Sequence, residues 1–204
     1  MKIKLSAIVM ILILVFSCSD ENTGNKVKAV YNLIKPSAGI YEVFAKNVDK
    51  DKIKGNFYEK QIFENNRLVK IERYNKKGDL TDGLFVPAIT VFEYDKDGKV
   101  KFVRYLDKNG NAANTPQFGY SVIEYVYGPD GKVIMEIYRD KNFNLLNVPR
   151  DENGNIKNVD FISPVLVYLY NGNILKIKAF DKNFNLIKET EGDKPCIPFI
   201  DCGE

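Results

Sequence analysis

The amino-acid sequence predicts an all-β protein, built as an antiparallel meander or β-solenoid of about four hairpin repeats. Three observations lead to this prediction. Pairs of aromatic residues return along the chain at similar spacings, turn-forming residues separate the two members of each pair, and apolar residues alternate with charged ones between them. The length of 204 residues leaves room for one domain or a short repeat array.

The first segment of the chain is predicted to be a targeting sequence. Lys2 and Lys4 precede an apolar run from Leu5 to Phe16, which is shorter than the ~20 residues that a bilayer-spanning helix needs. The run suits the hydrophobic region of a signal peptide. The letters "VFSC" that end it resemble a bacterial lipobox, although Phe16 departs from the usual residue there. We therefore expect residues 1–17 to be a lipoprotein signal peptide and Cys18 to be lipidated; a plain signal peptide or a short anchor helix are the alternatives.

Two short segments connect this anchor to the repeats. Residues 18–26 are polar and contain Gly and Asn, so they are expected to form a flexible tether after the lipidated cysteine. Residues 27–54 are expected to cap the first repeat. The stretch from Asn25 to Lys35, which overlaps the start of this region, precedes Pro36 and predicts either a short helix or a capping strand.

Residues 55–190 are predicted to form the hairpin repeat domain. The aromatic residues that precede the first turn of each repeat are Phe63, Tyr94, Tyr127 and Tyr170. The aromatic residues that follow the second strand are Tyr74, Tyr105, Tyr138 and Phe180. The period measured on this second set is 31, 33 and 42 residues, and a longer loop accounts for the last value. Four copies in one register favour a strand, turn, strand, turn unit whose neighbours bury a shared core.

Alternation within each second strand predicts which face is buried. The positions three and five before the second aromatic are all apolar: Ile71 and Val69, Phe102 and Val100, Met135 and Val133, and Ile177 and Leu175. The positions two and four before it are mostly charged, with Val103 and Ile134 as the exceptions. We expect the first set to point into the core and the second set, including Glu136, to face water.

The letters "YDKDGKV", "RYLDKNGN", "GYSVIEYVYGPDGKV" and "IYRDKNFN" resemble bacterial tyrosine–aspartate repeats of the YD or Rhs-like type. The resemblance covers about two-thirds of the chain. It implies a β-hairpin scaffold, carries no catalytic residues, and extends to repeats in Rhs-type toxin shells and small cell-envelope proteins. The last two repeats depart from the pattern because Phe143 and Phe184 replace the glycine of the second turn.

The C-terminal residues 191–204 are predicted to form a cysteine loop. Cys196 and Cys202 lie close together in a chain that is expected to be exported, where disulfide bonds persist. A disulfide between them would secure the end of the chain. Zinc would need more ligands than these two thiols, and the chain contains no histidine.

The acidic turns raise the question of calcium binding. Counted from Asp95 or Asp107, the glycines Gly98 and Gly110 fall at the fourth position, whereas an EF-hand loop needs glycine at the sixth. Asp and Asn side chains commonly accept hydrogen bonds from their own turns, and glycine accepts a positive φ. We interpret these residues as turn formers and predict no metal and no cofactor.

Charge and composition narrow the classes of function. The chain has 30 Lys and Arg and 27 Asp and Glu; loss of Lys2 and Lys4 with the signal peptide leaves 28 against 27. A near-neutral surface disfavours nucleic acid, which needs a basic face. The absence of histidine excludes Ser–His and Cys–His catalysis. A carboxylate-based hydrolase is disfavoured because the acids lie in turns or alternate with lysines.

The sequence therefore predicts a non-catalytic binding, adhesion or scaffold protein anchored by its lipid in the bacterial cell envelope, at the outer membrane or cell surface rather than the inner membrane. The candidate binding surface consists of Tyr74, Tyr105, Tyr138 and Phe180, which share a strand face with the charged residues and would suit a glycan or protein partner. Packing of these rings against each other is the alternative. An immunity or antitoxin-like protein that captures a toxin is a second functional hypothesis.

Overall fold

A computed structural model describes residues 26–37, 40–83, 86–148, 152–153, 163–171, 174–192 and 195. These residues form β-strands and one short 3-10 helix, which confirms the all-β prediction. The elements in chain order are β1 (Val27–Ser37), β2 (Ile40–Ala45), η1 (Lys50–Ile53), β3 (Tyr58–Glu64), β4 (Arg67–Tyr74), β5 (Ile89–Tyr94), β6 (Val100–Leu106), β7 (Val122–Tyr127), β8 (Val133–Arg139), β9 (Val165–Asn171), β10 (Ile174–Phe180) and β11 (Leu186–Glu191). Within the described residues, no helix is long and apolar enough to span a bilayer.

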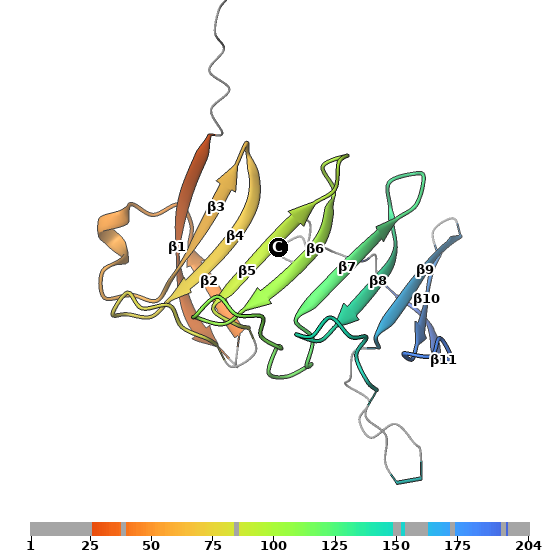
Figure 1. The fold of residues 1–204 in the computed structure, drawn as a ribbon. Coiled ribbons are helices and arrows are strands. Elements are labelled where there is room, and N and C mark those ends of the chain that lie inside the picture. The colour runs from red at the N-terminus through yellow and green to blue at the C-terminus, as the bar shows by residue number, and fades with distance from the viewer. Residues whose placement is uncertain are drawn as a thin grey trace, which may run out of the picture.

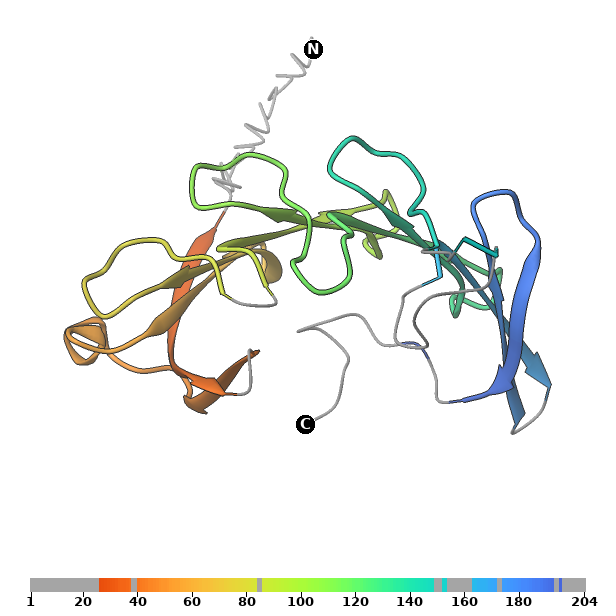
Figure 2. The ribbon, with the colours of Figure 1, turned by 90° about the horizontal axis from the view of Figure 1, so that it is seen from below.

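The strands form one open sheet of 11 strands in the order β11-β10-β9-β8-β7-β6-β5-β4-β3-β1-β2. Every pair is antiparallel, and from β3 onward each strand pairs with the next one in the sequence, as the predicted meander requires. The described part of the Asn25–Lys35 stretch is a strand, β1, which lies beside β3. Figures 1 and 2 show successive hairpins side by side in a curved sheet whose two ends bend toward the same side.

The hydrogen-bonded ladders are long within hairpins and short between them. In the β5–β6 hairpin, paired residues run from Ile89 and Leu106 to Tyr94 and Val100. Between neighbouring hairpins, β4 and β5, β6 and β7, and β8 and β9 each share a ladder of only three residue pairs. Each hairpin therefore separates from its neighbour toward the tight turn that joins its own two strands, as Figure 1 shows.

A tyrosine spans each of these separations. In all three cases the last tyrosine of a first strand donates its hydroxyl to a carbonyl at the start of the preceding hairpin's second strand. The three bonds, each 2.8 Å long, are Tyr94 Oη to Leu68 O, Tyr127 Oη to Val100 O and Tyr170 Oη to Val133 O. A cation at the start of that second strand, or one residue before it, covers each ring: Arg67 on Tyr94, Lys99 on Tyr127 and Lys132 on Tyr170. We call these contacts the tyrosine bridges.

A β-bulge in the second strand of three hairpins changes which residues are buried. In β6, Tyr94 pairs with Val100 while Glu93 pairs with Phe102, so Lys101 is the extra residue. Val69 in β4 and Ile134 in β8 are the corresponding extra residues. Side chains alternate between the two faces with a period of two residues. The extra residue of each bulge shifts this alternation by one, so positions after the bulge lie on the face opposite to the one expected.

The bulges overturn part of the predicted burial. Val100 and Val133 are buried as expected, but Phe102 and Met135 lie on the opposite face. Val103, expected to face water, is completely buried, and Glu136 is buried as well. We call the face that carries Val103 the inner face and the face that carries Phe102 the outer face.

Equivalent hydrogen bonds in the second turns show which residues of the repeats correspond in the structure. The residue before the last in β4, β6 and β8 accepts a backbone hydrogen bond from the loop that follows: Thr81 N to Arg73 O, Ala113 N to Tyr105 O and Leu146 N to Tyr138 O. Arg73 is therefore equivalent to Tyr105 and Tyr138, and the predicted match of Tyr74 with these tyrosines is displaced by one residue. Arg73 is 1 % exposed, and its Nη1 donates to Pro87 O and Thr90 Oγ1, each at 3.1 Å.

Tyrosine rings join the core along the inner face. The ring of Tyr120, in the loop after β6, packs edge to face on Tyr105 at 5.6 Å and on Tyr138 at 5.3 Å between ring centroids. Apolar residues from β4 to β10 surround these rings, including Ile71, Phe92, Val103, Ile123, Tyr168 and Leu175. Their burial on one face is the main source of stability for the sheet, because no other described element covers its opposite face.

Replacement of Tyr94 by Phe should lower the free energy of unfolding by about 1 kcal/mol, because the carbonyl of Leu68 loses a hydrogen bond across the hairpin boundary. Equilibrium unfolding in urea measures this change. Tyr58→Phe is the control, since that ring stacks on Tyr74 within one hairpin and spans no boundary. Equal losses in the two variants would contradict a special role for the bridge.

Candidate functional site

The structure divides the predicted aromatic surface between the two faces of the sheet. Tyr105 and Tyr138 are 4 % and 9 % exposed and belong to the core. Tyr74 and Phe180 lie on the outer face, one in β4 and the other in β10, and both are half-buried. These four rings therefore do not form one continuous surface. The predicted lipidation residue Cys18 and the predicted disulfide residues, Cys196 and Cys202, lie outside the described residues.

The aspartates of the second turns and of the Asp95 turn accept hydrogen bonds from the backbone of their own turns. The carboxylate of Asp107 accepts hydrogen bonds from the backbone N–H of Asn111 at 2.9 Å and of Asn109 at 2.8 Å. The hydrogen bond from Asn111 is the main reason why the pKa of Asp107 lies below its ordinary value. Asp95, Asp140 and Asp181 accept the same pair of backbone bonds. In the described part of the chain, no group of three acidic or cysteine residues could hold a metal ion.

Two phenylalanines adopt a backbone conformation that normally belongs to glycine. Gly78 and Gly110 occupy the second turns of the first two repeats with φ of 86° and 82°. Phe143 and Phe184 occupy the same positions in the next two repeats with φ of 69° and 61°. A left-handed conformation costs a residue with a Cβ atom roughly 1–2 kcal/mol. The last two turns therefore contain backbone strain that the first two lack.

Phe143 is the centre of a cluster on the outer face. Its ring packs edge to face against Phe102, with 6.1 Å between ring centroids. The guanidinium groups of Arg104 and Arg139 lie over the same ring at 5.3 Å and 4.9 Å from its centroid. Arg104 also covers Phe102 at 4.9 Å. Phe143 nevertheless remains 43 % exposed, so a partner molecule can reach it.

Glutamates hold both arginines in place. Arg104 Nε donates to Glu93, and Arg139 donates to Glu124 Oε2 through Nη2 at 3.0 Å and through Nε at 3.2 Å. The sheet supplies this arrangement, because β6, β7 and β8 are neighbours and Val122 pairs with both arginines in register. We call Glu93, Phe102, Arg104, Glu124, Arg139 and Phe143 the Phe143 cluster.

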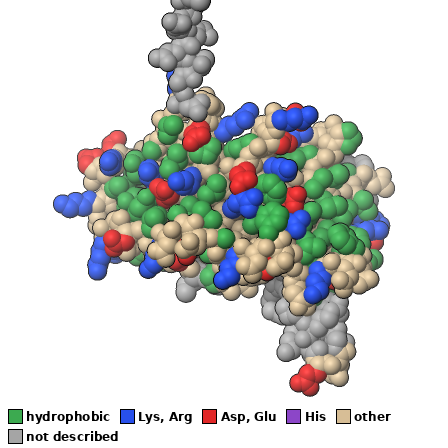
Figure 3. All heavy atoms as spheres, in the orientation of Figure 1, with side chains coloured by type: hydrophobic (Ala, Val, Ile, Leu, Met, Phe, Trp, Pro, Cys, Tyr) green, Lys and Arg blue, Asp and Glu red, His purple; other side chains and the backbone are tan. Residues whose placement is uncertain are grey.

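The outer face combines apolar side chains with paired charges along its length. Figure 3 shows apolar side chains interspersed with adjacent acidic and basic side chains over the strands. The two charges of each sign in the Phe143 cluster cancel. This surface therefore combines exposed aromatic area with fixed hydrogen-bonding groups and has little net charge.

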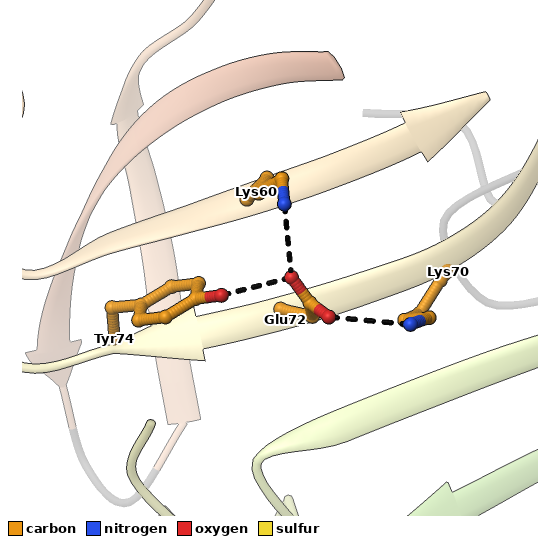
Figure 4. Close-up of polar contacts among 4 residues, drawn as sticks. All are labelled: Lys60, Lys70, Glu72 and Tyr74. Atoms are coloured by element: carbon orange, nitrogen blue, oxygen red, sulfur yellow. Dashed lines mark hydrogen bonds and ion pairs between the residues drawn. The ribbon is translucent and has the colours of Figure 1, made fainter. Parts of the chain in front are cut away.

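A second ionic group lies on the outer face of the first hairpin. Glu72 accepts a 2.8 Å hydrogen bond from the Tyr74 hydroxyl and pairs with Lys60 at 3.4 Å and Lys70 at 3.3 Å (Figure 4). Partial burial acts to raise the pKa of Glu72, but the Tyr74 hydrogen bond and the two lysines outweigh it and lower that pKa. The polar atoms of this group interact with one another, whereas the Phe143 cluster has an exposed residue, Phe143, at its centre.

No protein-family model, curated protein or solved structure matches the chain, so the site is assigned from its geometry alone.

Sequence reasoning identified Phe143 as a departure from the repeat but did not identify the residues around it. The available signal was an aromatic residue at a glycine position of a repeated turn. Arg104 had no such signal, because its approach to Phe143 depends on the cross-strand register of β6, β7 and β8. Arg139 lies four residues before Phe143 and donates to its carbonyl, a local contact that the repeat pattern did not single out.

Replacement of Phe184 by Asn should raise the free energy of unfolding by about 1 kcal/mol, because Asn tolerates a left-handed conformation better than Phe. Phe184 is 63 % exposed, so little packing is lost. Thermal unfolding measures the change. Phe184→Ala is the control that removes the ring but keeps the strain. If Ala stabilised the protein as much as Asn, backbone strain would not be the cause.

Replacement of Glu72 by Gln should destabilise the protein near pH 7 by about 1 kcal/mol, because the two lysines lose their counter-charge. The pKa of Glu72 is depressed below its ordinary 4.5 in the folded state, so its contribution exists above pH 4.5. The contribution is lost as the pH falls through the folded-state pKa. Urea unfolding of both proteins across this range measures it, with exposed Glu64→Gln as the control. A difference that persisted in acid would contradict the assignment.

Proposed function

We propose that the chain is a lipid-anchored bacterial cell-envelope protein whose sheet is a non-catalytic binding module, with the Phe143 cluster as its contact surface. The observation that carries this proposal is Phe143, an exposed residue with a strained backbone whose ring lies between two Arg–Glu pairs. Glycine forms the same turn twice earlier in the chain without strain, so the turn itself does not require the phenyl group. Strain of this kind is concentrated at functional sites in proteins.

The composition of the cluster supports binding. Aromatic residues and arginine contribute most to the affinity of protein surfaces for their partners. Here the arginines are held by glutamates and by ring contacts, so little side-chain entropy is lost when a partner binds. The same ion pairs disfavour catalysis, because Glu93 and Glu124 each already accept a hydrogen bond from an arginine.

The proposed anchor lies outside the described residues and rests on the sequence. Residues 1–17 would be removed as a signal peptide, Cys18 would be lipidated, and residues 18–26 would connect it to β1, which begins at Val27. A disulfide between Cys196 and Cys202 would secure the other end. The hairpins would stack as a solenoid, in which each repeat contacts only its neighbours. Fatty-acid labelling of wild type but not of Cys18→Ala would support the anchor; equal labelling would refute it.

Replacement of Phe143 by Asn should reduce retention of the purified full-length lipoprotein on bacterial envelope material about tenfold, because the exposed ring is lost while the turn keeps a tolerated residue. Retention is measured separately on peptidoglycan, outer-membrane and periplasmic fractions. Lys141→Ala, exposed in the same turn, is the control. Unchanged retention of Phe143→Asn, or no retention of the wild type on any fraction, would overturn the proposed function.

A further inference from the structure

Phe143 and Phe184 occupy equivalent turns beyond the C-terminal ends of β8 and β10. Both stand in the sequence "KNFNL", directly after β8 and β10. Each donates its backbone N–H to the aspartate that begins its turn, Phe143 N to Asp140 O at 2.9 Å and Phe184 N to Asp181 O at 3.0 Å. Both residues therefore stand at equivalent positions of the same turn, with φ of 69° and 61°.

The sheet fixes the spacing between the two turns. β8, β9 and β10 are adjacent, so the turns after β8 and β10 are separated by two strand spacings, about 10 Å. Both rings are exposed, by 43 % and 63 %. The equivalent turns of the first two repeats carry glycine, so they present no ring at this position. A linear ligand that runs across the strands and repeats at about 10 Å would therefore meet both turns in the same way.

We propose that Phe143 and Phe184 bind an uncharged β-1,4-linked polysaccharide that lies across these two turns. Consecutive disaccharides of such a chain repeat at a length close to the separation of the two turns. The apolar C–H face of a pyranose packs on a phenyl ring, and its hydroxyls can bond to charged side chains beside that ring. This inference rests on the proposed function, because it assigns a ligand class to the same surface.

Charge complementarity favours a neutral sugar. The two arginines beside Phe143 are each neutralised by a glutamate, so these pairs offer donors and acceptors without net charge, and Lys101 over Phe102 adds one positive charge. An anionic ligand would have to compete with Glu93 and Glu124 for these guanidinium groups. The balanced pairs can instead donate to and accept from neighbouring sugar hydroxyls at the same time.

The spacing also distinguishes a polysaccharide from an extended peptide. Side chains on one face of a β-strand repeat at roughly 6.6 Å, which does not match two turns about 10 Å apart. A polyproline helix repeats after three residues, at roughly 9.3 Å, and would match. Such helices dock into grooves between aromatic side chains. Because these two rings stand on separate exposed turns, the polysaccharide is the better fit.

The test is calorimetric titration of the full-length lipoprotein in detergent micelles with β-1,4-linked tetrasaccharides of glucose and of N-acetylglucosamine. At least one tetrasaccharide should bind, and the corresponding disaccharide should bind about tenfold more weakly, because it reaches one ring. Phe143→Asn and Phe184→Asn should each weaken tetrasaccharide binding about tenfold, and Lys141→Ala should not. An α-1,4-linked glucose tetrasaccharide, which has a different pitch, should bind weakly.

Three results would overturn the inference: no binding of either β-linked tetrasaccharide, unchanged affinity in both phenylalanine variants, or equal affinity for the α-linked sugar. A proline-rich decapeptide is titrated in parallel. Binding of that peptide alone would overturn the polysaccharide assignment while leaving the proposed binding function intact. Loss of that function would appear separately, as failure of the full chain to be retained on any envelope fraction.

Discussion

The hydroxyl of a tyrosine, donated across the boundary between two hairpins, is the interaction on which the joining of neighbouring hairpins depends where their ladders end. The ladders between hairpins hold only three residue pairs, and the strands separate beyond them. Tyr94, Tyr127 and Tyr170 close those separations with 2.8 Å bonds to the preceding hairpin. The carbonyl that each one reaches precedes a bulge, so the bulges and the tyrosine bridges form one repeated joint. This joint allows hairpins with short shared ladders to form a single curved sheet (Figure 2).

A sheet joined in this way has consequences for its surface. Burial is concentrated on the inner face, where the tyrosine rings and aliphatic residues pack, and the outer face can carry side chains for other purposes. The Phe143 cluster uses the register of β6, β7 and β8 to bring two Arg–Glu pairs beside one ring. The repeat then places a second phenylalanine, Phe184, at the equivalent turn two strands away. The proposed binding surface is thus a product of the same repetition that builds the fold.

Much of the fold could be predicted from the sequence, because turn chemistry and aromatic spacing are local signals. The acidic turns, the meander and the burial of Val100 and Val133 all follow from them. The bulges could not be predicted, since one extra residue changes neither composition nor turn spacing, yet it reverses the faces of Phe102 and Val103. The predicted alignment of the first repeat was displaced by one residue, because Arg73 fills a core position that tyrosine fills in the next two repeats. The strained turns were visible as a departure from glycine, but the approach of Arg104 to Phe143 depends on cross-strand register.

Native-state hydrogen exchange tests the central claim that the tyrosine bridges make the hairpins one cooperative sheet. The informative amides donate across hairpin boundaries: Arg73 to Ala88 O, Tyr105 to Ser121 O and Tyr138 to Pro164 O. If the bridges join the hairpins, these amides should exchange with the same opening free energy as amides inside the β5–β6 and β7–β8 ladders. Boundary amides that exchange at a much lower opening free energy, with each hairpin protected separately, would contradict it.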